Sequence, residues 1–257
     1  PLEDEDVRAE EAPRDGLPVT LRDWIKTDGL KLLKVKLCGR DLDTDIARYV
    51  RVARIARQEG VQSLAIDFNC TVPDLHYMRE FLDRLEKEMP EAFDLLAFIE
   101  QPFAADLERY GFDITDIARR KSLILDESAL DWKAVRLGAS LGWSGAALKI
   151  CKTQTEMILA YSWLRRRGMH VMVHDLTNPM LAQLAHLQMA ANLYTSAGVE
   201  TNSMQYYPHA SAVEEKVHPG AYRRTRGAVD ISTLGGNGFG YRLEDMERVL
   251  PEAEYVV

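Results

Sequence analysis

The chain repeats one pattern from residue 30 onward: a short apolar run, followed by a longer stretch with helical periodicity. The six clearest runs are LLKVKL at 32–37, SLAIDFN at 63–69, LLAFIEQP at 95–102, SLILDES at 122–128, GAALKIC at 145–151 and HVMVHD at 170–175. Between them lie good helix formers, as at 43–60, 74–90 and 155–168. Short strands that alternate with helices of this length predict a parallel sheet built from right-handed crossover units.

The number of units favours a closed barrel over an open sheet. A weaker run at 198–207 and the run LPVTL at 17–21 bring the six clear units close to the eight strands of a barrel. We therefore predict an α/β fold of the TIM type, a (β/α) barrel over residues 17–257. An open doubly wound sheet is the alternative, but no GxGxxG follows the first strand, and the GGNGFG at 235–240 is expected to form a turn.

Composition limits the classes of partner and the location. The formal net charge of -8 disfavours nucleic acid, because phosphate binding needs a basic surface. The sequence has no apolar run long enough for a membrane-spanning helix. Three cysteines without CxxC spacing indicate reduced thiols, which we expect to pack in the core. These features favour a soluble, cytoplasmic protein.

The first sixteen residues differ from the rest of the chain. They are acidic, lack apolar periodicity and follow no initiator methionine. We interpret residues 1–16 as a linker or tail, and the 257 residues as a part of a longer chain.

Every one of the six runs ends in polar residues, nearly all of them ionisable. The pairs in chain order are Lys34 and Lys36, Asp67 and Asn69, Glu100 and Gln101, Asp126 and Glu127, Lys149 and Lys152, and His174 and Asp175. In a barrel, the carboxyl ends of the strands converge on one face, so these side chains are expected to share a site.

Carboxylates at the ends of three consecutive strands predict a cation between them. A buried cluster of like charge is costly unless it is neutralised. Hard oxygen ligands favour Mg²⁺, with Mn²⁺ as the alternative.

Lysines flank the predicted carboxylate cluster on both sides. Lys34 and Lys36 are two residues apart on one strand, so both side chains project toward the barrel mouth, while Lys149 approaches from the opposite side. A neighbouring cation lowers the pKa of a lysine toward the range in which it can act as a base.

The motifs KVK, DFN, IEQP, LDES and LKICK, in this order and at barrel spacing, resemble the strand ends of the enolase superfamily, mandelate racemase and muconate lactonizing enzyme group. The resemblance implies the C-terminal barrel domain of such an enzyme, with the N-terminal capping domain absent from this chain.

The resemblance also implies a role for each strand-end residue. The metal ligands would be Asp67, Glu100 and Asp126, and the acid/base residues Lys36 and Lys149. Lys34 would tune Lys36, and Asn69, Gln101 and Glu127 would support the site. His174 and Asp175 are candidate substrate contacts, since HDLTNP differs from the acidic ending expected beside a lysine pair.

The implied reaction is metal-dependent removal of a proton alpha to a substrate carboxylate, through an enediolate. Its outcome would be racemisation, epimerisation or cycloisomerisation of a small-molecule carboxylate by a homo-oligomer. A sugar-acid dehydratase of the same superfamily is the nearest alternative. A non-catalytic barrel homologue and an aldolase with a Schiff-base lysine stay open, although the aldolase leaves the three acids unexplained.

Overall fold

The computed structural model describes residues 1–8, 10 and 15–249, and a parallel sheet of six strands lies at its centre. The strands are β1 (Leu32–Lys36), β2 (Ser63–Asp67), β3 (Leu96–Glu100), β4 (Ser122–Leu125), β5 (Gly145–Leu148) and β6 (His170–Val173). Each strand pairs in parallel with the next in the chain. All six predicted runs are therefore confirmed as strands of one α/β fold.

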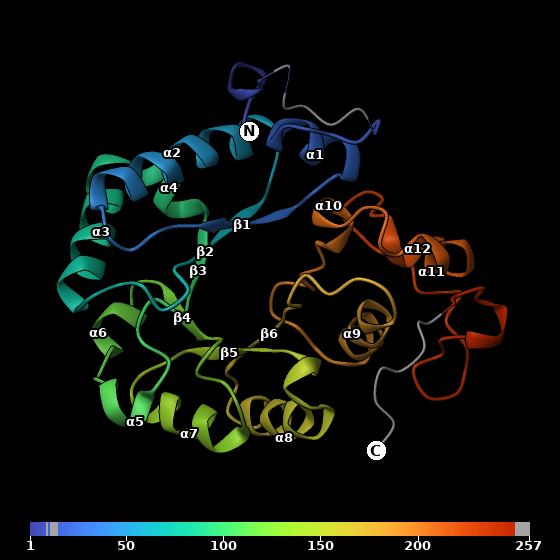
Figure 1. The fold of residues 1–257 in the computed structure, drawn as a ribbon. Coiled ribbons are helices and arrows are strands. Elements are labelled where there is room, and N and C mark those ends of the chain that lie inside the picture. Colours follow the sequence, from blue (N-terminus) through green and yellow to red (C-terminus); the bar gives the residue numbers. More distant parts are fainter. Residues whose placement is uncertain (9, 11–14, 250–257) are drawn as a thin grey trace.

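One helix precedes β1 and the others follow the strands, and together they cover the outer side of the sheet (Figure 1). They are α1 (Leu21–Asp28), α2 (Leu42–Gln58), α3 (Leu75–Glu88), α4 (Pro90–Leu95), α5 (Leu107–Tyr110), α6 (Thr115–Ala118), α7 (Trp132–Ser140), α8 (Gln154–Arg165) and α9 (Leu181–Asn192). The C-terminal part adds α10 (Ser203–Tyr206), α11 (Ala212–Val217) and α12 (Pro219–Tyr222). Three short 3₁₀ helices are η1 (Asp4–Asp6), η2 (Ile150–Lys152) and η3 (Leu243–Asp245).

Aspartate side chains begin three of the crossover helices. Asp41, Asp74 and Asp131 each accept a hydrogen bond from a backbone N–H in the first turn of α2, α3 and α7. Such caps satisfy donors that a helix leaves unpaired at its start. They fix the point at which each loop from a strand end becomes a helix.

Two apolar clusters lie on the two sides of the sheet, and a third, smaller one joins α9 to α12. The largest cluster lies between strands and helices and includes Phe68 and Phe81, whose rings pack edge to face. A smaller inner cluster consists of one residue from each of five neighbouring strands: Ala65, Phe98, Ile124, Ala147 and Met172. Leu32 of β1 and Ala197 pack against this inner cluster from its two ends. Alternate residues of each strand therefore fill the inside of a curved sheet, as in a barrel.

The sheet is curved but open, in the form of a half-barrel. β1 is an edge strand, paired only with β2. Beyond β6, the chain adds one parallel bridge, between Val173 and Val199. The closed barrel that the sequence predicts is thus reached only in part.

The two weaker strand predictions are wrong for most of their length. Residues 17–20 form no strand, because Thr20 accepts a hydrogen bond from Asp23 N and caps α1 instead. In the run at 198–207, Val199 makes the single bridge, and α10 replaces the remainder.

Other expectations have mixed outcomes. The GGNGFG segment forms a turn closed by hydrogen bonds of Gly235 N to Gly240 O and Gly240 N to Asn237 O. The three cysteines are free, as expected, but Cys38 and Cys151 are exposed, so they do not pack in the core.

No helix in the described part of the chain is long and apolar enough to cross a membrane. The division into a tail (1–16) and a barrel (17–257) stays a prediction. Residues 9 and 11–14 of the tail and 250–257 of the barrel lie outside the described residues.

Candidate active site

Three carboxylates lie at the ends of three neighbouring strands. Asp67 ends β2, Glu100 ends β3, and Asp126 directly follows β4. Asp67 and Glu100 are partners in the register of their strands, and all three side chains are buried. The structure therefore brings the predicted ligand residues to one edge of the sheet.

Lysine ammonium groups pair with each of these carboxylates. Lys34 Nζ lies 3.1 and 3.2 Å from the two oxygens of Glu100, and Lys36 Nζ donates to Asp67 and, at 3.0 Å, to Asn69 Oδ1. On the other side, Lys149 Nζ donates to Asp126 Oδ2 at 2.6 Å.

A fourth lysine, Lys152, which the sequence paired with Lys149 at the end of the fifth run, also reaches the site. Lys152 Nζ, from η2, donates to Asp126 Oδ1 at 3.1 Å and to the backbone oxygen of the same residue. Lysines from both flanks thus neutralise the carboxylate row within the chain itself.

The pKa values show how crowded these charges are. Burial, with the charges of Asp67 and Asp126, raises the pKa of Glu100 to about 8 despite the nearby Lys34. Burial opposes the charge of Asp126 as well, but Lys149 and Lys152 outweigh it and hold the pKa of Asp126 well below its usual value. Glu100 therefore loses its proton far less readily than Asp126 does.

The pKa values of Lys34 and Lys149 are both raised. Burial disfavours their charged forms, but Glu100 and Glu200 raise the pKa of Lys34 well above its ordinary value, and Asp126 raises that of Lys149. Both side chains are therefore held as ammonium ions in this state.

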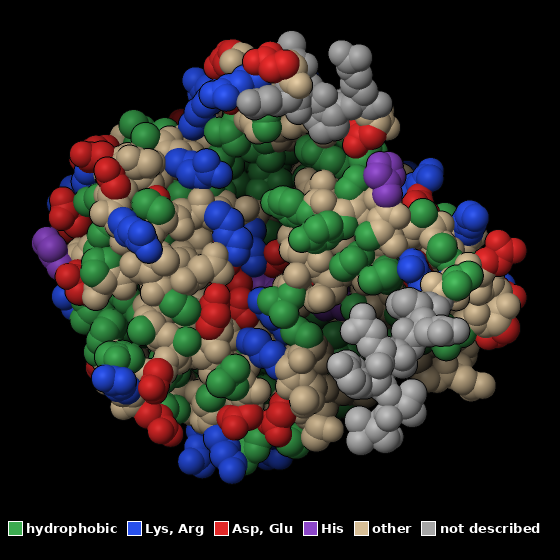
Figure 2. Space-filling view, viewed as in Figure 1, with side chains coloured by type: hydrophobic (Ala, Val, Ile, Leu, Met, Phe, Trp, Pro, Cys, Tyr) green, Lys and Arg blue, Asp and Glu red, His purple; other side chains and the backbone are tan. Residues whose placement is uncertain are grey.

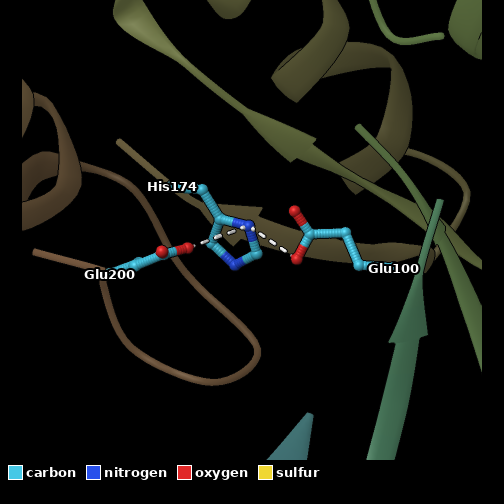
Figure 3. A group of neighbouring side chains, drawn as sticks. All are labelled: Glu100, His174 and Glu200. Atoms are coloured by element: carbon cyan, nitrogen blue, oxygen red, sulfur yellow. Dashed lines mark ion pairs between the residues drawn. The ribbon is translucent and has the colours of Figure 1, made fainter. Parts of the chain in front are cut away.

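His174 and Glu200 lie next to Glu100, and Figure 3 shows the His174 ring between the two glutamates. His174 Nδ1 lies 3.2 Å from Glu100 Oε2 and 3.5 Å from Glu200 Oε2, without the geometry of a hydrogen bond. Burial and Lys34 lower the pKa of His174 to about 3, so its buried ring is neutral.

Glu200 is a site residue that sequence reasoning missed. Its carboxylate lies 2.5 Å from Lys34 Nζ, and its backbone N–H donates to Val173 O at 2.9 Å. A signal was present: Glu200 follows Val199 within the weaker run at 198–207, so the strand-end rule applied to a seventh run would have selected it.

Gln101 is a clamp between two strand ends. Its side-chain oxygen accepts from Asp126 N at 2.8 Å and from Ser128 N at 3.1 Å. Its amide donates to Phe103 O and to Ser128 Oγ. The side chain is fully buried and these four bonds are internal, so Gln101 links the loops after β3 and β4, and its role at the site stays a prediction.

Of the remaining predicted residues, Asn69 and, through it, Glu127 are bonded to the carboxylate cluster, whereas Asp175 bonds a loop. Asn69 Nδ2 lies 3.1 Å from Asp67 Oδ2 and 3.0 Å from Glu127 Oε1, so it joins two acidic side chains. Asp175 instead accepts backbone N–H groups of Thr177 and Asn202, and thereby shapes a loop.

Left-handed backbone conformations mark the ends of β2 and β3. Asn69, Cys70 and Gln101 have φ values of 46°, 66° and 31°. Residues other than glycine adopt such values at a cost, and they concentrate at functional sites.

A cavity of about 690 Å³ opens onto the cluster between β1 and the segment that carries Glu200. Its lining includes Lys34, Phe98, His174 and Glu200. A hollow is visible in the upper middle of the space-filling view (Figure 2).

The donor set is suited to a divalent cation. Burial, and after it the charges of Asp67 and Asp126, raise the pKa of Glu100, so the three acids would gain from a cation between them. Among the described residues, the group whose ligand atoms all lie within 4.8 Å of one another is Glu100, His174 and Glu200. This group shares only Glu100 with the predicted ligands, whose roles stay predictions.

Comparisons with known proteins support the fold. Residues 17–247 match the model of the enolase C-terminal domain-like family. A search of curated proteins gives no match.

Solved structures share the fold. A mandelate racemase/muconate lactonizing protein from Herpetosiphon aurantiacus is 23% identical, with a TM-score of 0.59 over 70% of this chain and 49% of its own. A mandelate racemase/muconate lactonizing enzyme from Roseiflexus sp. is 23% identical, with a TM-score of 0.60 over 70% and 50%. The muconate lactonizing enzyme from Pseudomonas putida is 20% identical, with a TM-score of 0.56 over 70% and 48%. The chain spans about half the length of these structures.

Replacement of Gln101 by methionine tests the clamp. Methionine keeps the volume but leaves Asp126 N and Ser128 N without an acceptor. Each orphaned buried donor costs about 1–3 kcal/mol, so the free energy of unfolding in urea should fall by roughly 2–4 kcal/mol. The exposed Gln62→Met should change it by less than about 0.5 kcal/mol. Equal stability of the two variants would contradict the clamp.

Acid should destabilise the protein through His174. The folded pKa of about 3 lies below the ordinary 6.5, so only the unfolded chain takes up this proton between these values. The His174 contribution to the free energy of unfolding should therefore fall by about 1.4 kcal/mol per pH unit as the pH drops from 6.5 toward 3, while Glu100, with its pKa raised from 4.5 to about 8, contributes the opposite slope above pH 4.5. Urea titrations with a chelator on the unchanged protein and on His174→Gln measure the His174 contribution as the difference between the two curves, because Glu100 is present in both. Parallel curves for the two proteins would refute the assignment.

Proposed function

Because the chain belongs to the enolase C-terminal domain-like family, we propose that it is the catalytic part of a divalent-metal-dependent enzyme. The proposed reaction removes a proton alpha to a substrate carboxylate and gives racemisation, epimerisation or cycloisomerisation. One observation carries this proposal: three buried carboxylates at neighbouring strand ends have lysines on both flanks. This arrangement offers a cation site with a proton-transfer group at each side.

The proposed whole protein contains a closed (β/α) barrel and a capping domain. β1 is an edge strand, and the cavity separates it from Val199, the last residue bridged to the sheet. The inner cluster has contributions from Leu32 through to Ala197. One more strand between these two ends would continue the same cluster.

Asp67, Glu100 and Asp126 would hold Mg²⁺, or Mn²⁺ in its place. The bound cation would supply Lewis-acid stabilisation for the negative charge that develops on the substrate carboxylate. A protonated Glu100 would have to release its proton to join such a site.

Lys36 and Lys149 are the proposed proton carriers. Lys36 lies at the rim, with 55% of its side chain exposed, and its Nζ would accept the alpha proton once its ammonium has released a proton to solvent. Lys149 is buried and charged, so its Nζ holds a proton that it can deliver. Carriers on opposite sides of a substrate permit removal of a proton from one face and its return to the other.

His174 favours a second candidate, a sugar-acid dehydratase. Its neutral ring lies beside Glu100 and Glu200 and lines the cavity. A group in this place could help a hydroxyl group to leave the beta carbon. A carboxylate substrate, a cytoplasmic location and a homo-oligomer remain predictions from the sequence.

The proposed function is tested first by calorimetry of Mg²⁺ binding and then by deuterium exchange of candidate substrates. Asp67→Asn, Glu100→Gln and Asp126→Asn should each weaken binding by more than roughly tenfold, since even supporting residues cost about 10–100-fold. Asp94→Asn, an exposed acid on α4, is the matched control and should bind as the unchanged protein does. Carboxylates that then take up deuterium at the alpha carbon in D₂O would identify substrates, and Lys36→Met should stop this exchange.

Unchanged Mg²⁺ binding in all three variants would exclude the proposed metal site. The non-catalytic homologue would then be the better interpretation. Binding without deuterium uptake by any carboxylate would contradict the proton-transfer step alone.

A further inference from the structure

The loop after β1 is held by one buried carboxylate, Asp45. Asp45 lies in the first turn of α2 and is 1% exposed. Its oxygens accept from Cys38 N at 2.9 Å and from Gly39 N at 2.7 Å. Tyr77 OH, from α3, donates to the same carboxylate at 2.7 Å. One side chain thus ties two helices to a single loop.

Within the described part of the chain, a cation does not account for the burial of Asp45. Among the residues that the structure describes, no lysine, arginine or histidine is in ion-pair distance of its carboxylate. A buried carboxylate without a counter-ion is costly, and only its hydrogen bonds can compensate it. The loop must therefore keep its two N–H groups directed at Asp45.

This loop begins directly after the lysine that the proposed reaction uses. Lys36 is two residues before Cys38, and more than half of its side chain is exposed, so packing alone does not place it. Arg48, about one turn beyond Asp45 on α2, donates to Lys36 O at 3.0 Å. The backbone is therefore held by α2 on both sides of Leu37.

The same loop packs against the one that carries the partners of Lys36. Gly39 has a φ of 67°, and a Cβ there would lie 2.6 Å from Thr71 Oγ1 and 2.9 Å from Val72 N. Leu37 N also donates to Asp67 O at 3.1 Å. A shift of residues 37–39 would thus change how Lys36 meets Asp67 and Asn69.

We propose that Asp45, supported by Tyr77, is the positioning residue of Lys36. Its carboxylate fixes the loop after β1 and so directs the Lys36 ammonium at Asp67 and Asn69. The part of this inference that concerns proton transfer rests on the proposed function.

Two variants and a matched control test the proposal. Asp45→Asn keeps the shape but sets an amide N–H₂ against at least one donor, and Tyr77→Phe removes a single hydrogen bond. Asp43→Asn lies two residues away on α2, with 83% of the Asp43 side chain exposed, and changes only a surface pair with Arg84.

The first measurement needs no substrate. Mass spectrometry follows the rate at which an amine-specific acetylating reagent modifies Lys36, with the exposed Lys87 as the internal reference. Asp45→Asn should change the ratio of the two rates by several-fold, Tyr77→Phe less and in the same direction, and Asp43→Asn not at all.

The second measurement is the rate of deuterium uptake by a carboxylate substrate. Asp45→Asn should lower kcat by roughly 10–100-fold, because small misplacements of a catalytic group have effects of this size, with KM little changed. Asp43→Asn should leave both values as they are.

The outcomes separate the two proposals. If the unchanged protein exchanges no carboxylate proton, the proposed function fails and the labelling ratio alone decides the role of Asp45. If Asp45→Asn does not fold by circular dichroism, Tyr77→Phe decides it. Unchanged Lys36 labelling in the folded variants would overturn the positioning role.

Discussion

The structure depends on the compensation of buried carboxylates at the carboxyl edge of the sheet. Neighbouring strands lie about 4.8 Å apart, so acids that end β2 and β3 cannot avoid one another. Lys34 and Lys149 reach these acids from β1 and the end of β5, on the two flanks. Loss of one partner would leave a buried charge unpaired, which costs more than an intact pair contributes.

The loops beneath this network form one connected unit. Cys70 N donates to Gln101 O at 2.8 Å, Val72 N to Pro102 O, and Gln101 N to Ile124 O. The Gln101 side chain extends the series to the loop after β4, and Asp45 anchors its beginning after β1. The ends of β2, β3 and β4 are thus linked in series, which keeps the charged side chains at these ends in place.

Periodicity in the sequence predicted the part of the fold that repeats. Six strands and the polar residues at their ends followed from spacing alone, because parallel crossover units impose it. LPVTL misled the prediction, since Thr20 and Asp23 have the chemistry of a helix cap, which outweighed the strand propensity of the run.

The candidate site was predictable in its residues but not in its contacts. Strand ends identified Asp67, Glu100, Asp126 and the lysines, but no spacing rule says that Lys152 pairs with Asp126. Nor could the sequence show that Gln101 is fully buried, because its burial depends on tertiary contacts with the residues that follow β4. Glu200 was missed because its run is a single bridge, too short for a periodic signal.

The position of Glu200 gives the site two halves with different supports. One half is held by the hydrogen-bonded strand ends. Glu200, in the other half, is held by α9, where His186 Nε2 lies 2.8 Å from Glu200 O. Gln183, also on α9, accepts a hydrogen bond from the nearby Ser203. Lys34 joins these halves, since its ammonium reaches both Glu100 and Glu200. A lysine held charged by two acids is a poor proton acceptor, so its contribution to this site is electrostatic. It keeps the C-terminal segment against the strand ends, and the cavity lies beside this junction.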